Sequence, residues 1–347
     1  MPQSSRHVAS LTHGQVVHES DLGSVTKLTA DNFPILNRLS IKRLILEPGA
    51  IREPHWHANA NELSYCLSGS VLVSILDTGS SFSSFVVTAG QMFHVGSGSL
   101  HHIENIGAER AELIIAFRHE RPEDFALSSA FGAMADNVLG NAYDLPGSAF
   151  AGFPHRVEPS YLVRREGEPT LPSTAGYGDP HKFDVEGMAP PAASPVGSAR
   201  TARVQFWPIL KDISMYSLRI AEDGMREPHW HPITAEMGYI HRGRARMTVL
   251  DPDGTLDTYE LGPGDVYFIP RAYPHHIEVL GEEEIHFLIF FDQPTPGDIG
   301  YRASASAYSA EVLAATFGVP LGELPAFPYT PADPLIVGRA NPRDPTG

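Results

Sequence analysis

The chain has 347 residues, of which 42% are hydrophobic and 19% are charged, and its formal net charge is -16. This length suits two domains that each bury a core, and the composition excludes a disordered chain. The negative charge argues against a nucleic-acid partner and against a polybasic membrane contact, because both need a basic surface. A small anionic substrate is still compatible, since a bound metal and an arginine can make a site locally positive.

The single cysteine, Cys66, excludes an intramolecular disulfide bond, and its apolar surroundings in the sequence favour an inert, packed thiol. Residues 1–20 are polar and lack the apolar region of a secretory signal. No apolar run reaches the ~18 to 20 residues that span a bilayer. We therefore expect a soluble, cytoplasmic protein.

We expect residues 1–35 to form a polar N-terminal arm and residues 36–146 to form a first domain. From Ser40, short runs rich in β-branched and aromatic residues alternate with turns of Gly, Asp and Ser. This pattern predicts an antiparallel sandwich or barrel. From about Ala126 the pattern changes and favours a short helical segment.

A Pro/Gly-rich stretch, residues 147–200, is expected to connect the two halves of the chain. Residues 201–347 then repeat the series of short strands and form the second domain. A helical pattern follows the strands and reaches Phe317, where Gly318 is a plausible stop signal. The last segment, from Pro325, is Pro-rich and is expected to be extended.

One motif occurs in both halves at the same spacing. Residues 52–57 and residues 226–231 both read Arg-Glu-Pro-His-Trp-His, and each is followed by a glutamate and then by a distant histidine. Corresponding residues are 174 positions apart, and the match runs without a gap through about 75 residues, which indicates an internal duplication.

The repeated residues predict two metal sites. Side chains at i and i+2 of a strand share a face, so both histidines of each His-x-His aim the same way. Three imidazoles and one carboxylate form a mixed N/O set with open coordination positions, which suits manganese(II), iron, nickel or zinc. We favour manganese(II), two ions per chain. The predicted ligands are His55, His57, Glu62 and His101 in the first copy, and His229, His231, Glu236 and His275 in the second.

The last histidine of each set belongs to a His-His doublet, and strand alternation lets only one member face the interior. We choose His101 and His275, because each stands 11 positions after a turn glycine, Gly90 or Gly264. His94 has a phenylalanine as its counterpart and receives no ligand role.

The spacing Gly-x5-His-x-His-x4-Glu-x6-Gly is complete from Gly49 to Gly69, and in the second copy it is met from His229 to Gly243 with the leading glycine one residue late. A second motif, Gly-x5-Pro-x3-Pro-His, is complete from Gly264 to His275. Together these motifs resemble a bicupin, and the chain is most similar to the oxalate decarboxylase group. The resemblance implies an all-β fold of two tandem cupin barrels (double-stranded β-helix, or jelly-roll), each holding one metal and followed by short helices. It also implies a homo-oligomer, a trimer or a hexamer.

In this family an arginine just before the His-x-His pair steadies the substrate carboxylate, and Arg52 and Arg226 occupy that position. A structural ion pair with a nearby acid is the alternative role for these arginines. The family also carries a lid glutamate that donates or accepts a proton, and the corresponding stretch here, residues 117–125, offers Glu123 and Asp124. Asp298 is the counterpart of Asp124 in the second copy, which favours a structural role shared by both halves.

A further acidic residue of the family, in the last strand of the second barrel, falls at Ile289, and its counterpart in the first copy is Ile115. The leading interpretation is a metal-dependent enzyme acting on a small carboxylic acid, with oxalate converted to formate and carbon dioxide. The altered lid and these apolar positions favour the alternative of an oxidase, dioxygenase or isomerase, with dioxygen as a co-substrate. A non-catalytic storage or sugar-binding bicupin is a third interpretation, against which the retention of all eight ligands argues.

Overall fold

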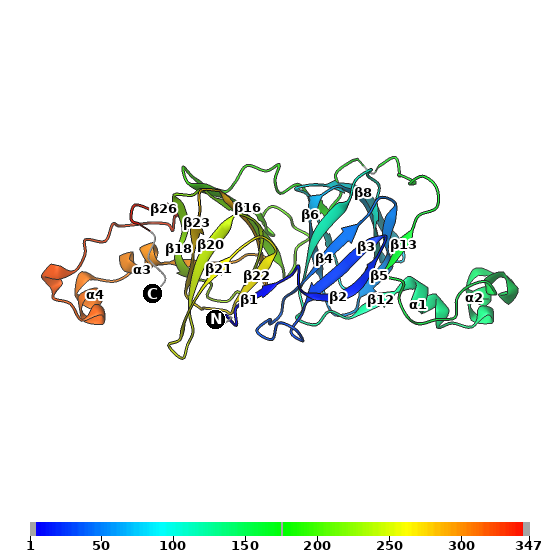
Figure 1. Ribbon diagram of the computed structural model, residues 1–347, viewed down its shortest axis with the longest axis horizontal. Coiled ribbons are helices and arrows are strands. Elements are labelled where there is room, and N and C mark those ends of the chain that lie inside the picture. Colours follow the sequence, from blue (N-terminus) through cyan, green and yellow to red (C-terminus); the bar gives the residue numbers. More distant parts are fainter. Residues whose placement is uncertain (1–4, 175, 343–347) are drawn as a thin grey trace. The chain divides into compact units, whose positions relative to one another are not determined.

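The computed structural model describes residues 5–174 and 176–342, so the ends of the predicted arm and of the second domain, and residue 175, lie outside the described residues. The chain divides into two compact units. We call residues 13–187 the first-repeat unit, and the residues up to Thr12 together with those from Met188 onward the second-repeat unit. Each unit contains two antiparallel sheets, and the predicted all-β fold is confirmed (Figure 1).

The first-repeat unit carries its His-x-His motif in the sheet ordered β12-β5-β10-β7-β8, in which β13 also pairs with β5. Its other sheet is ordered β14-β9-β6-β11-β4-β3-β2. The strands of the first sheet are β5 (Ala50–His57), β7 (Ser70–Thr78), β8 (Ser81–Thr88), β10 (Leu100–Asn105), β12 (Asp124–Ala126) and β13 (Leu162–Arg164). Those of the second are β2 (Gln15–Ser20), β3 (Gly23–Leu28), β4 (Ser40–Leu46), β6 (Glu62–Ser68), β9 (Met92–Val95), β11 (Ala111–Phe117) and β14 (Lys182–Phe183).

The core of this unit follows from strand alternation. Every second residue of β11, from Ala111 to Phe117, belongs to one cluster of buried apolar side chains, and Leu44 and Leu46 of β4 join it. Cys66 is part of the same cluster, and burial raises the pKa of its thiol to about 12, which confirms an inert, packed cysteine.

A glycine closes the motif where two chain segments approach closely. Gly69 has φ +85°, and a Cβ there would lie 2.6 Å from the Cα of Ala111. Gly243 has φ +77°, and a Cβ there would lie 2.8 Å from the carbonyl oxygen of Glu284. Both positions therefore require a residue without a side chain.

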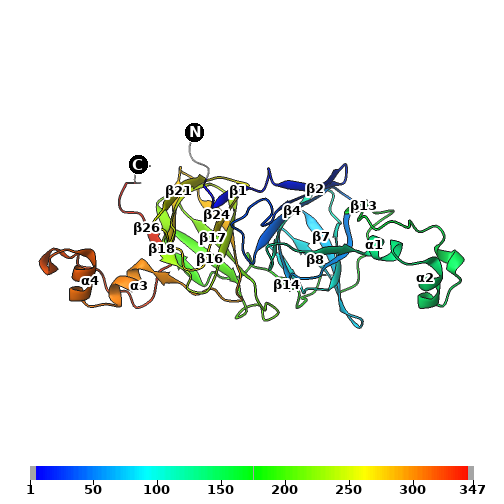
Figure 2. The same ribbon diagram turned by 90° about the horizontal axis from the view of Figure 1, so that it is seen from below.

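Short helices follow the barrel of the first-repeat unit, as the sequence predicts. α1 (Leu127–Gly132), α2 (Asp136–Tyr143) and the 3-10 helix η1 (Gly147–Phe150) come directly after β12. The two perpendicular views agree that α1 and α2 extend away from the strands of their own unit (Figure 2).

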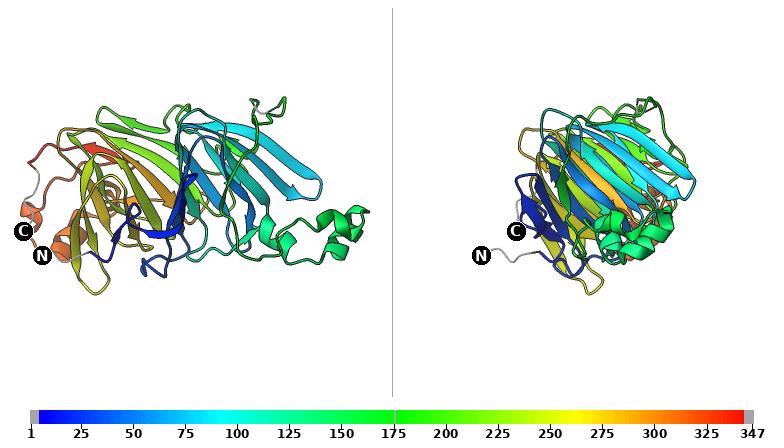
Figure 3. Two further views of the ribbon diagram at one scale, coloured as in Figure 1. Left: turned by 45° about the vertical axis from the view of Figure 1, so that its right-hand side comes forward. Right: turned by 90° about the vertical axis from the view of Figure 1, so that its right-hand side faces the viewer.

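The second-repeat unit has the same architecture, and the left view of Figure 3 shows its green-to-orange strands running side by side. One sheet is ordered β1-β22-β19-β24-β17-β16-β15, and the other is ordered β21-β20-β23-β18-β25 with β26 beside β18. The strands are β1 (Val8–Ser10), β15 (Ala192–Ser194), β16 (Gly197–Ala202), β17 (Ser214–Ile220), β18 (Gly224–Trp230), β19 (Glu236–Arg242), β20 (Arg244–Leu250), β21 (Leu256–Leu261), β22 (Asp265–Ile269), β23 (His275–Leu280), β24 (Ile285–Phe291), β25 (Ile299–Gly300) and β26 (Ile336–Gly338).

Helices also follow this second set of strands: α3 (Tyr301–Ser306), α4 (Ala310–Phe317) and the 3-10 helix η2 (Leu321–Glu323). The hydroxyl of Ser309 caps α4 by accepting a hydrogen bond from the backbone N–H of Val312. Gly318 ends the helix in the left-handed conformation, which confirms the predicted stop. None of the helices in the described part of the chain is long and apolar enough to cross a membrane.

The segments predicted as an arm and as a connection contribute strands to the barrels. β1 pairs with β22 of the second repeat, and β14 pairs with β9 of the first repeat. Val8 and Lys182 are 174 positions apart, as are their partners Tyr267 and Phe93. The first strand of each repeat is therefore hydrogen-bonded into the barrel of the other repeat.

Candidate metal centres

The four predicted ligands of the first-repeat unit come together from three strands. β5 carries His55 and His57, β6 begins with Glu62, and β10 carries His101 directly opposite His55. All four side chains are buried, and one ligand atom from each lies within 4.8 Å of the others. We call this group the first centre.

The second-repeat unit builds the equivalent group, which we call the second centre. His229 lies on β18 opposite His275 of β23, Glu236 begins β19, and His231 directly follows β18. These side chains are also buried, with their ligand atoms within 4.8 Å of one another. Neither second member of a His-His doublet belongs to a group, as predicted.

Backbone carbonyls fix the orientation of four of the six histidines. In each, Nδ1 donates to the carbonyl oxygen two residues earlier, at 2.8 Å for His55, 3.0 Å for His101, 2.7 Å for His229 and 2.9 Å for His275. This bond assigns the proton to Nδ1 and leaves the lone pair of Nε2 for a metal.

Carboxylates orient the remaining two histidines. Nδ1 of His57 lies 2.7 Å from Asp124 Oδ1. Nδ1 of His231 donates to the carbonyl oxygen of Gly297 at 3.1 Å and lies 2.8 Å from Asp298 Oδ1. A carboxylate behind a ligating imidazole holds the ring and makes it a stronger donor. The predicted structural role shared by Asp124 and Asp298 is thus seen in both units.

The donor set fits a divalent cation. Burial lowers the pKa of His55 and His229 well below the ordinary value, so both rings are neutral donors. Burial opposes the charge of Glu62 and Glu236, but neighbouring histidines hold their pKa well below the ordinary value, so both are carboxylates. The Nε2 atoms of His101, His229 and His275 are buried without a hydrogen bond to another described residue. Such polar atoms need a partner, and a cation at the centre would supply it.

The ligand glutamate is supported by a hydroxyl in both centres, but from different strands. In the first centre Ser64, on the same strand as Glu62, donates to its Oε1 at 2.7 Å. In the second centre Tyr267 of β22 donates to Oε1 of Glu236 at 2.5 Å. Gly238 makes this possible, because a Cβ at that position would lie 2.0 Å from the Tyr267 ring.

Sequence reasoning missed this exchange. Gly238 is the counterpart of Ser64, and Tyr267 is the counterpart of Phe93. A comparison of the two copies could have revealed it, because Ser64 and Phe93 in the first copy are replaced together by Gly238 and Tyr267 in the second.

The two arginines predicted to bind a substrate carboxylate, Arg52 and Arg226, are buried beside the ligands, but their hydrogen-bond partners differ. In the first centre Arg52 Nη1 donates to the carbonyl oxygen of Tyr161 at 3.3 Å, and Nη2 lies 3.8 Å from Asp124 Oδ2. In the second centre Arg226 donates to the carbonyl oxygen of Leu335 and to Oδ2 of Asp298. Arg226 thus makes the structural ion pair that we considered as an alternative role.

The two predicted general acids, Glu123 and Asp124, have different surroundings. Glu123 is exposed, and its backbone is held by Ala58 N–H at 2.9 Å and by the side chain of Asn59 at 2.9 Å. Asp124 is bound to His57 and to Lys42, at 2.7 and 2.5 Å. These contacts overcome the effect of burial and hold the pKa of Asp124 far below its ordinary value, which suits an orienting carboxylate rather than a proton donor.

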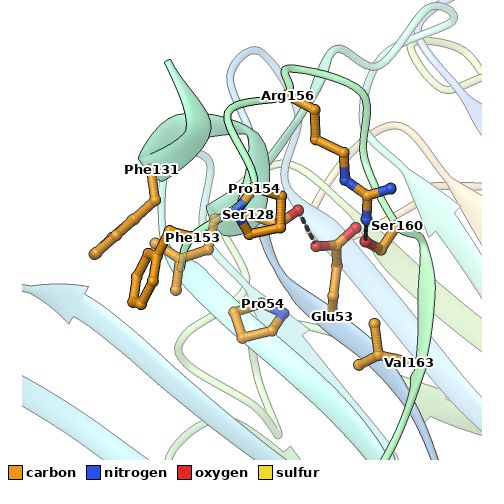
Figure 4. A pocket seen from close by; sticks show the side chains of 10 residues that line it. Glu53, Pro54, Ser128, Phe131, Phe153, Pro154, Arg156, Ser160 and Val163 are labelled. Carbon is orange, nitrogen blue, oxygen red and sulfur yellow. Dashed lines mark hydrogen bonds between the residues drawn. The ribbon is translucent and has the colours of Figure 1, made fainter. Parts of the chain in front are cut away.

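A separate pocket of about 470 Å³ lies on the other side of the motif and contains none of the ligands (Figure 4). Glu53 and Pro54 contribute to it from β5, together with Phe131 and Phe153 from the helical segment. Glu53 accepts hydrogen bonds from Ser128 Oγ at 2.5 Å and from the backbone N–H of the Tyr161 residue at 2.6 Å. The glutamate of the repeated motif therefore anchors the helical segment to the barrel.

Two cupin barrels, each with a buried three-histidine, one-glutamate cluster, define the class of protein. The model of the cupin family (Cupin) matches residues 10–149 and 189–321, so the chain belongs to this family and is a bicupin. It is 29% identical over 286 residues to the oxalate decarboxylase OxdC of Bacillus subtilis, covering 80% of this chain and 73% of that protein. It is also 25% identical over 310 residues to a probable oxalate decarboxylase of Arthroderma benhamiae, covering 86% of this chain and 76% of that protein.

Solved structures agree on the fold. Bacillus subtilis oxalate decarboxylase at pH 4.6 aligns with a TM-score of 0.85 and 24% identity over 98% of this chain and 89% of that chain. A further structure of that enzyme, described with Mn(II) centres, aligns with a TM-score of 0.85 and 23% identity over 98% of this chain and 90% of that chain.

Proposed function

We propose that this protein is a manganese-dependent bicupin enzyme that decarboxylates a small dicarboxylic acid, and that oxalate is its substrate. The observation that carries the proposal is the first centre itself, where a complete ligand set lies beside the buried guanidinium of Arg52, whose ion pair with Asp124 is long, at 3.8 Å. A planar guanidinium matches a carboxylate with two parallel hydrogen bonds. The similarity to oxalate decarboxylases supports the choice of oxalate.

The reaction balances without an added oxidant or reductant. The C–C bond of the oxalate dianion breaks, one carbon leaves as carbon dioxide, and the other takes a proton from solvent to become formate. A divalent metal, held by His55, His57, Glu62 and His101, would act as a Lewis acid that stabilises negative charge on the substrate oxygens.

The other residues have supporting roles in this proposal. Arg52 binds the second carboxylate, and Asp124 holds His57 in its ligating orientation. Glu123, whose exposed side chain follows the last long strand of the barrel, is the candidate carrier of the proton between solvent and the substrate carbon. Ile115 belongs to the buried apolar cluster of the first-repeat unit and keeps the interior beside β11 apolar.

The experiment is an oxalate assay on protein with a measured metal content, run under argon and in air. We expect one formate for each oxalate consumed, in both atmospheres, without hydrogen peroxide. Peroxide without formate, and only in air, would show the oxidase that we considered as the alternative. Neither product from protein with both centres filled would overturn the choice of oxalate.

A further inference from the structure

The two centres have the same set of ligand types but differ at one residue beside the ligands. Lys42 on β4 and Tyr216 on β17 are 174 positions apart, and each pairs in register with the isoleucine of the last long strand, Ile115 or Ile289. Both side chains also lie against corresponding phenylalanines. Lys42 Nζ is 4.6 Å from the centre of the Phe117 ring, and the Tyr216 ring is 5.0 Å from that of Phe291.

Lys42 is a buried cation, with a side chain that is 10% exposed. An ammonium removed from water needs a charged or strongly polar partner, because its desolvation is costly. Its partner is Asp124, whose Oδ2 lies 2.5 Å from Nζ. The Phe117 ring face adds a cation–π contact.

This pairing determines what Asp124 can do for Arg52. Asp124 uses Oδ1 for His57 and Oδ2 for Lys42, and the nearest Arg52 nitrogen remains 3.8 Å from Oδ2. Among the described residues, the ion pair of Arg52 with Asp124 is therefore longer and weaker than that of Lys42 with Asp124.

The second centre shows the opposite arrangement. Asp298 uses Oδ1 for His231 and Oδ2 for Arg226, so the arginine is paired. Tyr216 supplies no cation, since burial raises the pKa of its phenol to about 12 and keeps it neutral. The next cation, Arg203, is hydrogen-bonded to Tyr216 rather than to a carboxylate of the centre.

The fixed charges next to the ligands therefore differ by one unit. In the first centre two cations, Lys42 and Arg52, balance two carboxylates, Asp124 and Glu62. In the second centre Arg226 faces the two carboxylates Asp298 and Glu236, and the nearby Arg203 is hydrogen-bonded to Tyr216. A divalent metal would raise these sums to plus two and plus one. A dicarboxylate dianion would then bring the first sum to zero and the second to minus one, so only the first centre would be neutral with the dianion bound.

We propose that Lys42 is a positioning residue that occupies Asp124, leaves Arg52 available to an anionic ligand, and thereby makes the first centre the dicarboxylate-binding centre of the two. The inference deepens the proposed function and rests on it for the identity of the anion. The second centre, with its arginine already paired, holds a metal without the same capacity for a dianion.

The experiment measures oxalate binding to the full chain loaded with manganese(II), by calorimetry and by the electron paramagnetic resonance of the two ions. Wild-type protein is expected to bind one oxalate, with a change in the signal of one ion. Lys42→Met is expected to weaken this binding about tenfold or more while both ions are retained. Lys42→Arg, which keeps the charge, is expected to restore most of the affinity.

The reciprocal variant acts on the other unit and leaves the first centre intact. Tyr216→Lys places a cation beside Asp298, and we expect it to raise the oxalate stoichiometry from one to two. This variant keeps the inference testable if Lys42→Met does not fold. Circular dichroism and the metal content of every variant are the controls for folding.

Three results would overturn the inference: two equal oxalate sites or none in the wild type, unchanged binding in Lys42→Met with both ions present, or a stoichiometry of one in folded Tyr216→Lys. Formate is measured in the same samples. If Lys42→Met weakens oxalate binding and Lys42→Arg restores it, but no formate forms, the role of Lys42 is supported and the proposed reaction is contradicted. If formate forms but oxalate binding is the same in both variants, the proposed reaction is supported and the role of Lys42 is contradicted.

Discussion

At the scale of single residues, the duplicated chain keeps a contact while exchanging the residues that make it. In both centres a hydroxyl donates a hydrogen bond to Oε1 of the ligand glutamate, from Ser64 in the first and from Tyr267 in the second. Groups that support metal ligands in this way typically change metal affinity by about 10- to 100-fold when they are removed. The contact is therefore part of the site, although neither residue touches the metal position.

Tyr267→Phe is expected to lower the manganese affinity of the second centre by about tenfold or more, since Oε1 of Glu236 loses its hydrogen bond. Competition with a chelator measures this affinity. Adding Gly238→Ser to that variant copies the residue pair of the first centre. It is expected to recover part of the loss, because the ring is no longer held by Glu236 and can turn away from the new Cβ. Gly238→Ser alone is the matched control, and it is expected to be the worst of the three because a Cβ there would meet the Tyr267 ring. Equal affinities in wild type and Tyr267→Phe would contradict the supporting role.

The second centre is also expected to bind metal in competition with a proton. Burial lowers the pKa of His231, but hydrogen bonds to Asp298 and Glu236 outweigh it and raise the pKa to about 9. The ring is thus protonated in the metal-free protein at neutral pH, and a metal must displace that proton from Nε2. Apparent affinity should rise about tenfold per pH unit towards pH 9 and then level off.

Proton release into a weak buffer during manganese uptake tests this expectation, in a His101→Ala variant that retains only the second centre. Uptake without proton release at pH 7 would contradict it.

The raised pKa of His231 also affects the stability of the metal-free protein. The charged ring stabilises the fold fully below the pKa of histidine in the unfolded chain, about 6.5, and this stabilisation is lost as the pH rises through about 9.

At the scale of structural elements, the feature with the largest consequence is the pairing of each repeat's first strand with the other barrel. A buried histidine precedes each exchanged strand. His7 contacts the carbonyl oxygen of Phe268 at 2.8 Å and Asp251 at 3.2 Å. His181 contacts the carbonyl oxygen of the His94 residue at 2.9 Å and Asp77 at 3.3 Å. β1 and β14 are thus each anchored by a buried histidine that contacts a backbone carbonyl and an aspartate.

Replacing His7 by alanine should loosen β1 and lower the stability of the second-repeat unit by about 2 to 3 kcal/mol, because two buried acceptors lose a partner. Arg6 still pairs with Asp251 at 2.6 Å, which limits the loss. Hydrogen exchange of β1 and β22, together with denaturant unfolding, measures the effect. His13→Ala, at an exposed position, is the control and is expected to stay within about 0.5 kcal/mol of wild type.

The strands were predictable where polar and apolar residues alternate, as in β20, because its apolar face (Ala245, Met247 and Val249) lies in the core. β1 and β14 were not, since they have only three and two residues and owe their strand conformation to partners far away in the sequence. Local patterns carry no information about such pairing.

At the scale of the whole molecule, the duplication explains why the ligands were predictable and the surrounding residues were not. The eight predicted ligands lie in two buried groups, and they were visible in the sequence because they recur at identical spacing. Lys42 and Asp124 act through contacts between strands 82 positions apart, which no motif encodes. Their counterparts Tyr216 and Asp298 show that one half has changed while the ligands have not.

The measurement that tests this description most directly is the metal content of the protein. Metal-depleted chain dialysed against manganese(II) should bind two ions, and one ion should be lost in His57→Ala and one in His231→Ala. The same two variants in combination should bind none. One ion or none per chain in the folded wild-type protein would contradict two metal centres, and two ions in either single variant would contradict the ligands assigned here.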